Sequence, residues 1–361
     1  MEYFGKGRKL RMDIKQDLWS YLEQTDKPIV MYGMGNGADK ILERLDELNI
    51  AIADFFASDG FVRGHSFHGK TVLSFSEIKE KYPDFIILLS FASSLDNMLD
   101  VFYSMNGEYE MYAPDVPVTG DGTFTLEYYN ENKDKFDLAR SLLADEASRH
   151  VFDNVIIYKL TGKICYLREC ETLPSEALGI LSPSKYEICV DAGAYNGDTA
   201  KQMIFDFPNL KKIYALEPDS RNFKKLSAYS EEECRVIPIN AAAWNENTLL
   251  EFDASGNRNA NFFSLNTKKT VNIPAKTIDS VCESKADYIK FDVEGAEKNA
   301  LLGSKSTISS SSPDMLISVY HRNEDLFELP LLVHSLSPDS KLYLRKFKYV
   351  PAWDLNLYAV K

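Results

Sequence analysis

The sequence has 361 residues, a net charge of −13, a pI near 5.0 and 45% hydrophobic residues. This length predicts two domains, and the acidic balance argues against duplex nucleic acid or an anionic membrane as a partner. The N-terminus lacks the apolar core of a signal peptide, and no apolar run approaches the ~18 residues of a membrane span, so we expect a cytoplasmic protein. Its five cysteines, an odd number without a CxxC pair, are expected to be reduced core thiols.

The first part of the chain alternates between helix and strand patterns. Apolar residues at helical spacing from Ile14 to Leu22 predict an amphipathic helix. Strands are predicted at residues 28–32, 50–56 and 84–90, with helical patterns after Gly37 and at 76–81. This βαβ alternation predicts a small parallel sheet, in a Rossmann-like domain over residues 1–119.

The turn GMGNGA after the first strand is close to the GxGxxG dinucleotide fingerprint, with Ala38 in the last position. Asp54 or Asp59 would then contact a ribose. The other interpretation, which we favour, is that the glycines only let strand and helix pack closely. His65 and His68 are expected to be loop residues rather than a metal pair, because no further ligand lies at the required spacing.

Residues 120–180 have a charged, helical pattern and predict a connector between two domains. It either supports both domains or forms a contact in a homo-oligomer, and the sequence does not separate these. Further along the chain, Ser309 to Ser312 before Pro313 predict a loop.

The second α/β domain, residues 181–361, opens with the string VDAGAYNGDT. A buried strand is predicted at 186–190, and a helix follows that Asp198 or Thr199 can cap. Gly193 and Gly197 lie between them and let a ligand approach bare backbone. Such a crevice beyond the carboxyl end of a strand is where open α/β sheets bind ligands.

The next two predicted strands bring further polar groups to the same edge. The strand at 212–216 ends at Glu217, whose carboxylate can accept hydrogen bonds from ribose hydroxyls. The strand at 235–239 leads into Asn240-Ala241-Ala242-Ala243-Trp244, where small residues leave room for a flat base unless Trp244 is a core aromatic. Two short antiparallel strands are predicted at 249–252 and 272–275, with residues 257–263 as a substrate-facing loop between them.

Charged residues also follow the strand in YIKFDVEGAE, which must stop at Gly295. Asp292 and Glu294 therefore reach the carboxyl edge, where they bind a ligand or are simply ion-paired. A strand at 315–320 delivers His321 to this edge, and a helix starts in RNEDL at 322–326. Strands at 341–347 and 355–360, antiparallel to each other, complete the sheet.

At these residues the chain resembles the FkbM-type methyltransferase family of S-adenosylmethionine-dependent enzymes. The resemblance runs from Tyr186 to the C-terminus and rests on VDAGAYNGDT, ALEPD, TID, IKFDVEGAE, YHRNEDL and LYLRKF. It implies an α/β protein of two Rossmann-like doubly wound domains joined by a helical connector, the C-terminal one with a class I methyltransferase fold. The N-terminal part more weakly resembles the nucleotide-binding-like domain that accompanies sugar-modifying enzymes.

The resemblance also implies a set of site residues. The cofactor-binding residues would be Asp191 and Gly193 for the methionine end, Glu217 for the ribose and Asn240 and Ala241 for the adenine, together with Tyr195, Asp198 and Thr199. Asp292, Glu294 and His321 would face the acceptor. Members of the family mainly methylate hydroxyl oxygens of sugars or small metabolites, so a sugar, glycan or small molecule is the expected substrate.

For the mechanism, we expect His321 to act as the general base while Asp292 and Glu294 orient the acceptor or the histidine. A divalent metal held by the two carboxylates is the competing arrangement, although no metal is predicted. Two other functions remain open: a nicotinamide-dependent nucleotide-sugar oxidoreductase that uses GMGNGA, and a nonenzymatic nucleotide-sugar binding protein.

Overall fold

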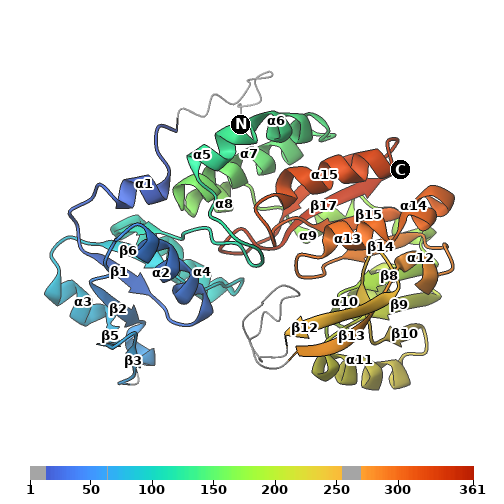
Figure 1. Ribbon diagram of the computed structural model, residues 1–361, viewed down its shortest axis with the longest axis horizontal. Helices are drawn as coiled ribbons and strands as arrows, with labels where there is room; N and C mark the ends of the chain where they lie inside the picture. The colour runs from blue at the N-terminus through green and yellow to red at the C-terminus, as the bar shows by residue number, and fades with distance from the viewer. Residues whose placement is uncertain (1–13, 63, 254–269) are drawn as a thin grey trace.

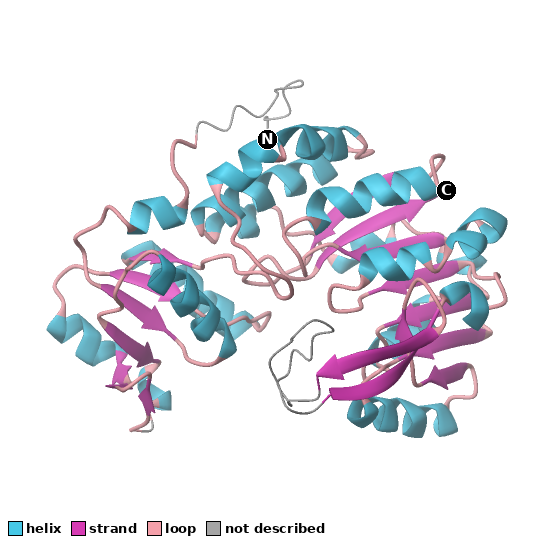
Figure 2. Cartoon of the chain, in the orientation of Figure 1, coloured by secondary structure: helices cyan, strands magenta, loops and turns pink. Residues whose placement is uncertain are grey.

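The computed structural model describes residues 14–62, 64–253 and 270–361. Figure 1 shows an N-terminal α/β part in blue and cyan, a group of green helices, and a larger α/β part in yellow to red. Figure 2 shows that each α/β part is a sheet with helices packed against it. These arrangements confirm the predicted α/β class. The division at residues 119 and 180 stays a proposal.

The N-terminal sheet has the strand order β5-β2-β1-β6-β7, and all its pairs are parallel. Every residue of β1 and β6 is buried, as expected for strands covered on both faces. Alternate residues of β1 enter different cores, since Val30 and Met31 belong to separate hydrophobic clusters. The elements are α1 (Leu18–Leu22), β1 (Ile29–Tyr32), α2 (Asn36–Glu47), β2 (Asp54–Ala57), β5 (Leu73–Ser74), α3 (Phe75–Lys81), β6 (Ile86–Leu89), α4 (Asp96–Glu108) and β7 (Glu110–Tyr112), with a short hairpin of β3 (Ser66–Phe67) and β4 (Lys70–Thr71).

The central helices connect the two sheets and bury a long shared core. They are α5 (Leu126–Glu131), α6 (Lys133–Ser141), α7 (Glu146–Thr161), α8 (Cys165–Glu169) and α9 (Pro174–Leu178). Helix α7 ends at Gly162, which has a φ of 66° and closes the helix in the left-handed conformation. One hydrophobic cluster contains Val30 of the N-terminal sheet, Phe152 of α7 and Leu344 of the C-terminal sheet, so the connector is packed against both.

The C-terminal sheet has seven strands in the order β10-β9-β8-β14-β15-β17-β16. Its strands are parallel except β17, which is antiparallel to both β15 and β16. The strands are β8 (Ile188–Ala192), β9 (Lys212–Leu216), β10 (Val236–Ile239), β14 (Tyr288–Phe291), β15 (Asp314–Ser318), β16 (Lys341–Lys346) and β17 (Leu355–Val360). The helices that cover them are α10 (Asp198–Asp206), α11 (Ser220–Glu232), α12 (Ile278–Val281), α13 (Glu297–Leu302), α14 (Lys305–Ser311) and α15 (Asp325–Leu336).

A smaller sheet of β11 (Ala242–Ala243), β13 (Thr270–Lys276) and β12 (Thr248–Asp253) lies beside it, with β12 and β13 antiparallel as predicted. The substrate-facing loop predicted at 257–263 lies outside the described residues.

Several sequence expectations were wrong in detail. Strand β8 begins at Ile188 rather than at Tyr186, whose hydroxyl donates to Asp314 at 2.6 Å. Gly197, not Asp198 or Thr199, is the N-cap of α10, because its φ of 90° makes the turn into the helix. The serine run at 309–312 is not a loop, since α14 continues to Ser311. The helix predicted at 322–326 starts only at Asp325, and Cys165 and Cys234 are exposed rather than in the core.

Within the described residues, no helix combines the length and the apolar character needed to cross a membrane.

Candidate functional site

The polar residues selected from the sequence follow five strands that are neighbours in the C-terminal sheet. In sheet order they come after β10, β9, β8, β14 and β15. Because these strands are parallel, their carboxyl ends share one edge. The structure therefore brings all eleven predicted residues to this edge: Asn240 and Ala241, then Glu217, then Asp191, Gly193, Tyr195, Asp198 and Thr199, then Asp292 and Glu294, and finally His321.

Asp191, at the end of β8, is completely buried, and neither of its carboxylate oxygens has a hydrogen-bond partner among the described residues. Its nearest cation is Lys290, whose Nζ is 3.5 Å from Oδ1. Burial raises the pKa of Asp191 to about 6. A buried carboxylate with free lone pairs is costly for the protein alone and is ready to accept hydrogen bonds from a cationic ligand.

Lys290, on the adjacent strand β14, was not selected from the sequence. Its Nζ also lies 3.4 Å from Asp292 Oδ2, so one ammonium is shared between two carboxylates. Burial opposes its charge, but Asp292 and Asp191 together raise its pKa. The signal that could have identified it is the alternation in IKFDVEG, where Lys290, Asp292 and Glu294 occupy every second position. In a strand such positions point to the same face, so Lys290 could be expected near the two acids.

Gly193 has a φ of 88°, and a Cβ there would lie 1.8 Å from the carbonyl oxygen of Asp292. A glycine is therefore needed for the close approach of the turns after β8 and β14. This reason differs from the ligand contact predicted from the sequence, which stays a prediction.

Glu217 is 6% exposed, and its two carboxylate oxygens accept the backbone N–H groups of Tyr195 at 2.9 Å and Asp219 at 2.8 Å. These two bonds fix its orientation and leave lone pairs free on both oxygens. Burial raises its pKa to about 7 despite the two bonds. The arrangement fits a carboxylate that receives two neighbouring hydroxyl groups.

The remaining cofactor candidates extend this row. Asn240 donates through Nδ2 to the carbonyl oxygen of Glu217 at 2.8 Å, and the adjacent Ala241 is fully buried. Asp198 accepts the backbone N–H of Thr199 at 2.8 Å in the exposed first turn of α10. Asn240 thus holds the turn after β9 in place.

His321 is the centre of a cluster of carboxylates. It is 1% exposed, and its Nδ1 lies 3.0 Å from Oε1 of Glu297, which is equally buried. Its Nε2 faces Asp292 Oδ1 at 3.6 Å and Glu294 Oε2 at 3.5 Å. Burial opposes a charged imidazole, yet Glu297, Asp292 and Glu294 raise the pKa of His321 to about 10. The imidazole is therefore charged at neutral pH in this arrangement, which is not the protonation state of a general base.

Glu297 was missed in the sequence, although it lies in the same string as Asp292 and Glu294. It occupies the first turn of α13, where it also accepts the backbone N–H of Val293 at 2.8 Å. Acids are common in the first turn of a helix, so the sequence alone does not single out this one. The buried carboxyl of Asp325, which accepts the N–H of Arg322 at 2.8 Å, lies against the same cluster and was missed as well.

The segment that leaves the N-terminal sheet also reaches this site. Thr119 donates its backbone N–H to the carbonyl oxygen of His321 at 2.9 Å, and Asn323 donates to the carbonyl oxygen of Gly122 at 3.3 Å. No local sequence pattern announces these contacts, which join residues about 200 positions apart in the chain.

In the N-terminal part, the residues proposed for a ribose contact are already engaged. Asp54 accepts from Lys81 at 2.7 Å and from Tyr82 at 2.5 Å, and Asp59 accepts from Ser76. A Cβ on Gly37 would lie 2.2 Å from the carbonyl oxygen of Ser90, so this glycine allows α2 to approach β6. These contacts support the packing interpretation of the GMGNGA turn. His68 pairs with Asp39 at 2.8 Å.

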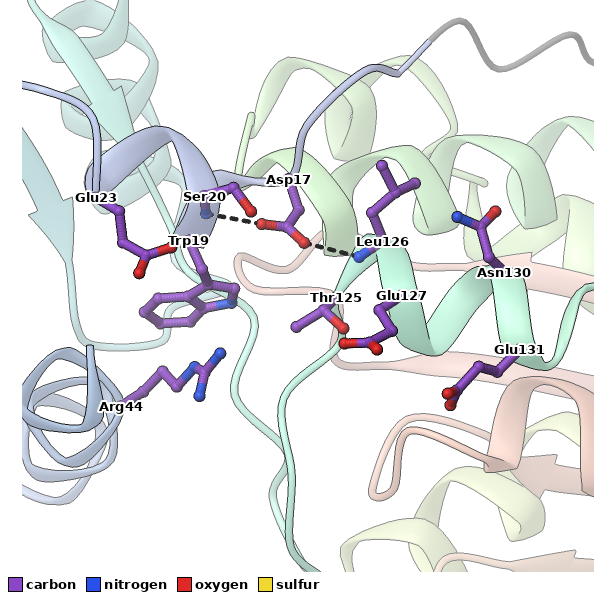
Figure 3. A pocket seen from close by; sticks show the side chains of 10 residues that line it. All are labelled: Asp17, Trp19, Ser20, Glu23, Arg44, Thr125, Leu126, Glu127, Asn130 and Glu131. Atoms are coloured by element: carbon purple, nitrogen blue, oxygen red, sulfur yellow. Dashed lines mark hydrogen bonds between the residues drawn. The ribbon is translucent and has the colours of Figure 1, made fainter.

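A pocket of about 600 Å³ lies elsewhere, where α1, α2 and α5 meet (Figure 3). Its best-placed acid is not free, because Asp17 accepts the N–H groups of Ser20 at 2.8 Å and Leu126 at 2.7 Å, the two bonds drawn in Figure 3. Trp19 is 2% exposed and packs into the core. The pocket lies between the first helix, α2 and the connector, and none of the residues that line it belongs to the C-terminal sheet.

A parallel sheet with acids at the carboxyl ends of its central strands is an arrangement that can bind a nucleotide-like cofactor at that edge. Residues 191–350 match the model of the Methyltransferase FkbM domain, and this match identifies an S-adenosylmethionine-dependent methyltransferase. The resemblance stated from the sequence motifs is thereby confirmed.

One solved structure has a similar fold over most of the chain. A methyltransferase FkbM from Methylobacillus flagellatus KT is 21% identical in sequence and superposes with a TM-score of 0.70. The match covers 92% of this chain and 90% of that chain. Fibrillarin from Aeropyrum pernix with natively bound S-adenosyl-L-methionine is 13% identical and covers 48% of this chain and 66% of that chain at a TM-score of 0.31, too low to carry an argument. A comparison with curated protein sequences gives no match.

Proposed function

We propose that this protein transfers a methyl group to a hydroxyl oxygen of a sugar, a glycan or another small metabolite. The observation that carries the proposal is the juxtaposition of two different groups of acids along one sheet edge. Asp191 and Glu217 fit a cationic, ribose-containing cofactor, whereas Asp292, Glu294 and His321 form a charged cluster beside it. The second group is suited to a polar acceptor that must lose a proton.

S-Adenosylmethionine supplies an electrophilic methyl group on a sulfonium. Asp191, with two free carboxylate oxygens, is proposed to hold the ammonium of its methionine end, and Glu217 to hold the ribose hydroxyls. Tyr195, Asp198, Thr199, Asn240 and Ala241 would border the cofactor. Burial of Asp191 keeps water from competing for its oxygens, so an incoming ammonium gains strong hydrogen bonds.

On the acceptor side, the roles differ from those expected from the sequence. Because Glu297 and its neighbours favour the charged imidazole, we assign His321 the task of holding the carboxylates in place, with Glu294 as the proton acceptor. The Glu294 side chain is 58% exposed, so a proton taken from the acceptor can pass on to water. Correct placement of the hydroxyl supplies much of the rate.

The test is a methyl-transfer screen with labelled cofactor against sugars, nucleotide sugars and glycan fragments. The Asp191→Asn variant is the comparison, since it alters the proposed cofactor site and reaches the acceptor cluster only through the shared Lys290. A labelled product from a hydroxylated sugar, formed by the wild type and lost in the variant, would support the proposal. Transfer only to nitrogen or carbon acceptors would contradict it.

A further inference from the structure

The side chains of Asp292, Glu297 and His321 each offer one ligand atom, and these atoms lie within 4.8 Å of one another. Across residues 14–62, 64–253 and 270–361, this is the one group of three such residues close enough to share a metal ion. The members come from two adjacent strand ends and the first turn of α13. The set mixes oxygen and imidazole ligands.

We propose that Asp292, Glu297 and His321 bind a divalent cation of the Mn²⁺ type at the acceptor side of the methyltransferase site. Two carboxylates and one imidazole suit such an ion better than they suit Ca²⁺, which takes oxygen ligands only, or a soft metal, which prefers thiolates. Only a neutral imidazole binds an ion, so the cation would displace the proton that His321 carries in its absence. Glu294 lies beside the set, outside the group of three, and keeps its carboxylate free to accept a proton.

The distances are the first support. Ligand atoms bound at about 2.1 Å to one octahedral or tetrahedral ion are separated by roughly 3 to 4.5 Å. His321 Nε2 is 3.6 Å from Asp292 Oδ1 and 3.5 Å from Glu294 Oε2. Both separations are longer than a charge-assisted hydrogen bond, which measures about 2.7–2.9 Å. The imidazole therefore faces these oxygens at the spacing of ligands around an ion rather than of bonded partners.

The second support is a buried polar atom without a partner. Glu297 is 1% exposed, and its Oε2 has no hydrogen-bond partner within the part of the chain that the structure describes. Its other oxygen accepts the N–H of Val293 at 2.8 Å and pairs with His321, so the side chain is held in place. An unsatisfied buried carboxylate oxygen costs free energy that a bound cation would recover.

The third support is the balance of charge. The carboxylates of Asp292, Glu294 and Glu297 surround a single imidazole. Lys290 approaches only the other oxygen of Asp292, at 3.4 Å, and is shared with Asp191. The cluster thus holds more negative charge than its own cations offset, and a divalent ion would correct this excess.

The position of the ion suggests its task. It would coordinate the acceptor hydroxyl and make that hydroxyl more acidic. The O–H bond of the acceptor then breaks, the proton forms a new O–H bond with Glu294, and the electron pair stays on the acceptor oxygen. This task rests on the methyl transfer proposed above, whereas binding of the ion does not.

The direct test is Mn²⁺ titration of the chelator-treated, full-length protein, followed by the electron paramagnetic resonance signal of free Mn²⁺. We expect one site in the wild type. Asp292→Asn and Glu297→Gln should each weaken binding by at least about tenfold, the loss typical for altered metal sites. Glu187→Gln is the matched control, because this exposed acid precedes β8 at the opposite edge of the sheet and should leave binding unchanged.

Absence of a Mn²⁺ site in the wild type, or equal binding by wild type and Asp292→Asn, would overturn the proposal. Circular dichroism checks that each variant is folded. If Glu297→Gln does not fold, the result for Asp292→Asn is the deciding one, because the Asp292 side chain is 32% exposed and its replacement disturbs the core less. Calorimetry with S-adenosylhomocysteine in the presence of chelator separates the two proposals. If the protein binds the cofactor but not Mn²⁺, only the metal-site proposal is contradicted. If it binds Mn²⁺ but transfers a methyl group to no hydroxyl, only the proposed function is contradicted.

Discussion

The backbone N–H of Thr119 donates to the backbone carbonyl oxygen of His321 at 2.9 Å. The segment that carries Thr119 is in turn held by the N-terminal part, because Lys40 of α2 donates through Nζ to the carbonyl oxygens of Pro117 at 2.7 Å and Val118 at 2.8 Å. Helix α2 of the N-terminal part is therefore connected, through the linking segment, to His321, which we propose to lie on the acceptor side.

This connection predicts that Lys40→Met destabilises the protein and loosens the segment at 117–122. Losing two hydrogen bonds from a charged donor should cost about 2 kcal/mol of the free energy of unfolding. Denaturant unfolding measures the cost, and hydrogen exchange of the segment measures the loosening. Lys79→Met is the control, since Lys79 is exposed and lies over the ring of Phe75. Equal protection of residues 117–122 in wild type and Lys40→Met would show that α2 does not hold the segment.

Glu217 predicts a pH dependence of cofactor binding. Burial raises its pKa to about 7, and only the carboxylate can accept from two hydroxyls without donating a proton itself. Affinity for S-adenosylhomocysteine should thus rise about tenfold from pH 6 to pH 8, as Glu217 loses its proton. Calorimetry at several pH values measures this rise. In Glu217→Gln the affinity should be low and nearly flat over the same range, and a slope as steep as that of the wild type would assign the titration to another group.

Asp191 predicts opposite effects on binding and on stability. Its pKa is raised from 3.8 to about 6, so the folded protein binds a proton there more readily than the unfolded chain does. The free energy of unfolding therefore falls as pH rises from about 4 to 6, and at pH 7 the buried charge costs of the order of 3 kcal/mol. Asp191→Asn should leave the ligand-free protein at least as stable as the wild type at pH 7.

The same substitution should lower affinity for S-adenosylhomocysteine by more than tenfold, because a charge-assisted hydrogen bond to the ammonium is lost. Thermal unfolding with and without ligand measures both effects in one experiment. A variant that is much less stable without ligand, or one that binds the ligand as tightly as the wild type, would show that Asp191 has a structural role.

His321 predicts a separation of turnover from cofactor binding. Its ring contacts the carboxylates of Glu297, Asp292 and Glu294, and none of the residues assigned to the cofactor. His321→Gln should lower kcat strongly, by roughly 100-fold or more as for a lost acid–base or orienting group, with little change in the Kd of S-adenosylhomocysteine. Steady-state kinetics with an acceptor from the screen, together with calorimetry, measure the two values. Unchanged turnover in His321→Gln would show that His321 has no role in the reaction.

The sequence by itself determined the α/β class, the position of most strands and the edge of the sheet that carries the candidate site residues. Short buried runs such as KIYAL predict strands, and polar residues that follow parallel strands must meet at one edge. This local information is sufficient to place Asp191, Glu217, Asp292 and His321 at one edge of the sheet. It was not sufficient to place strand ends, since β8 is shifted by two residues and Gly197 replaces the predicted cap.

The tertiary structure alone decided the electrostatics of these residues. The proton affinity of His321 depends on Glu297, which reaches it from the first turn of α13, and the free oxygens of Asp191 depend on how completely the turn after β8 is covered. Burial and neighbouring charge act through space, between residues that no sequence spacing relates. For the same reason the contacts of Thr119 and Lys40, which join the two α/β parts at the site, become visible only once the chain is folded.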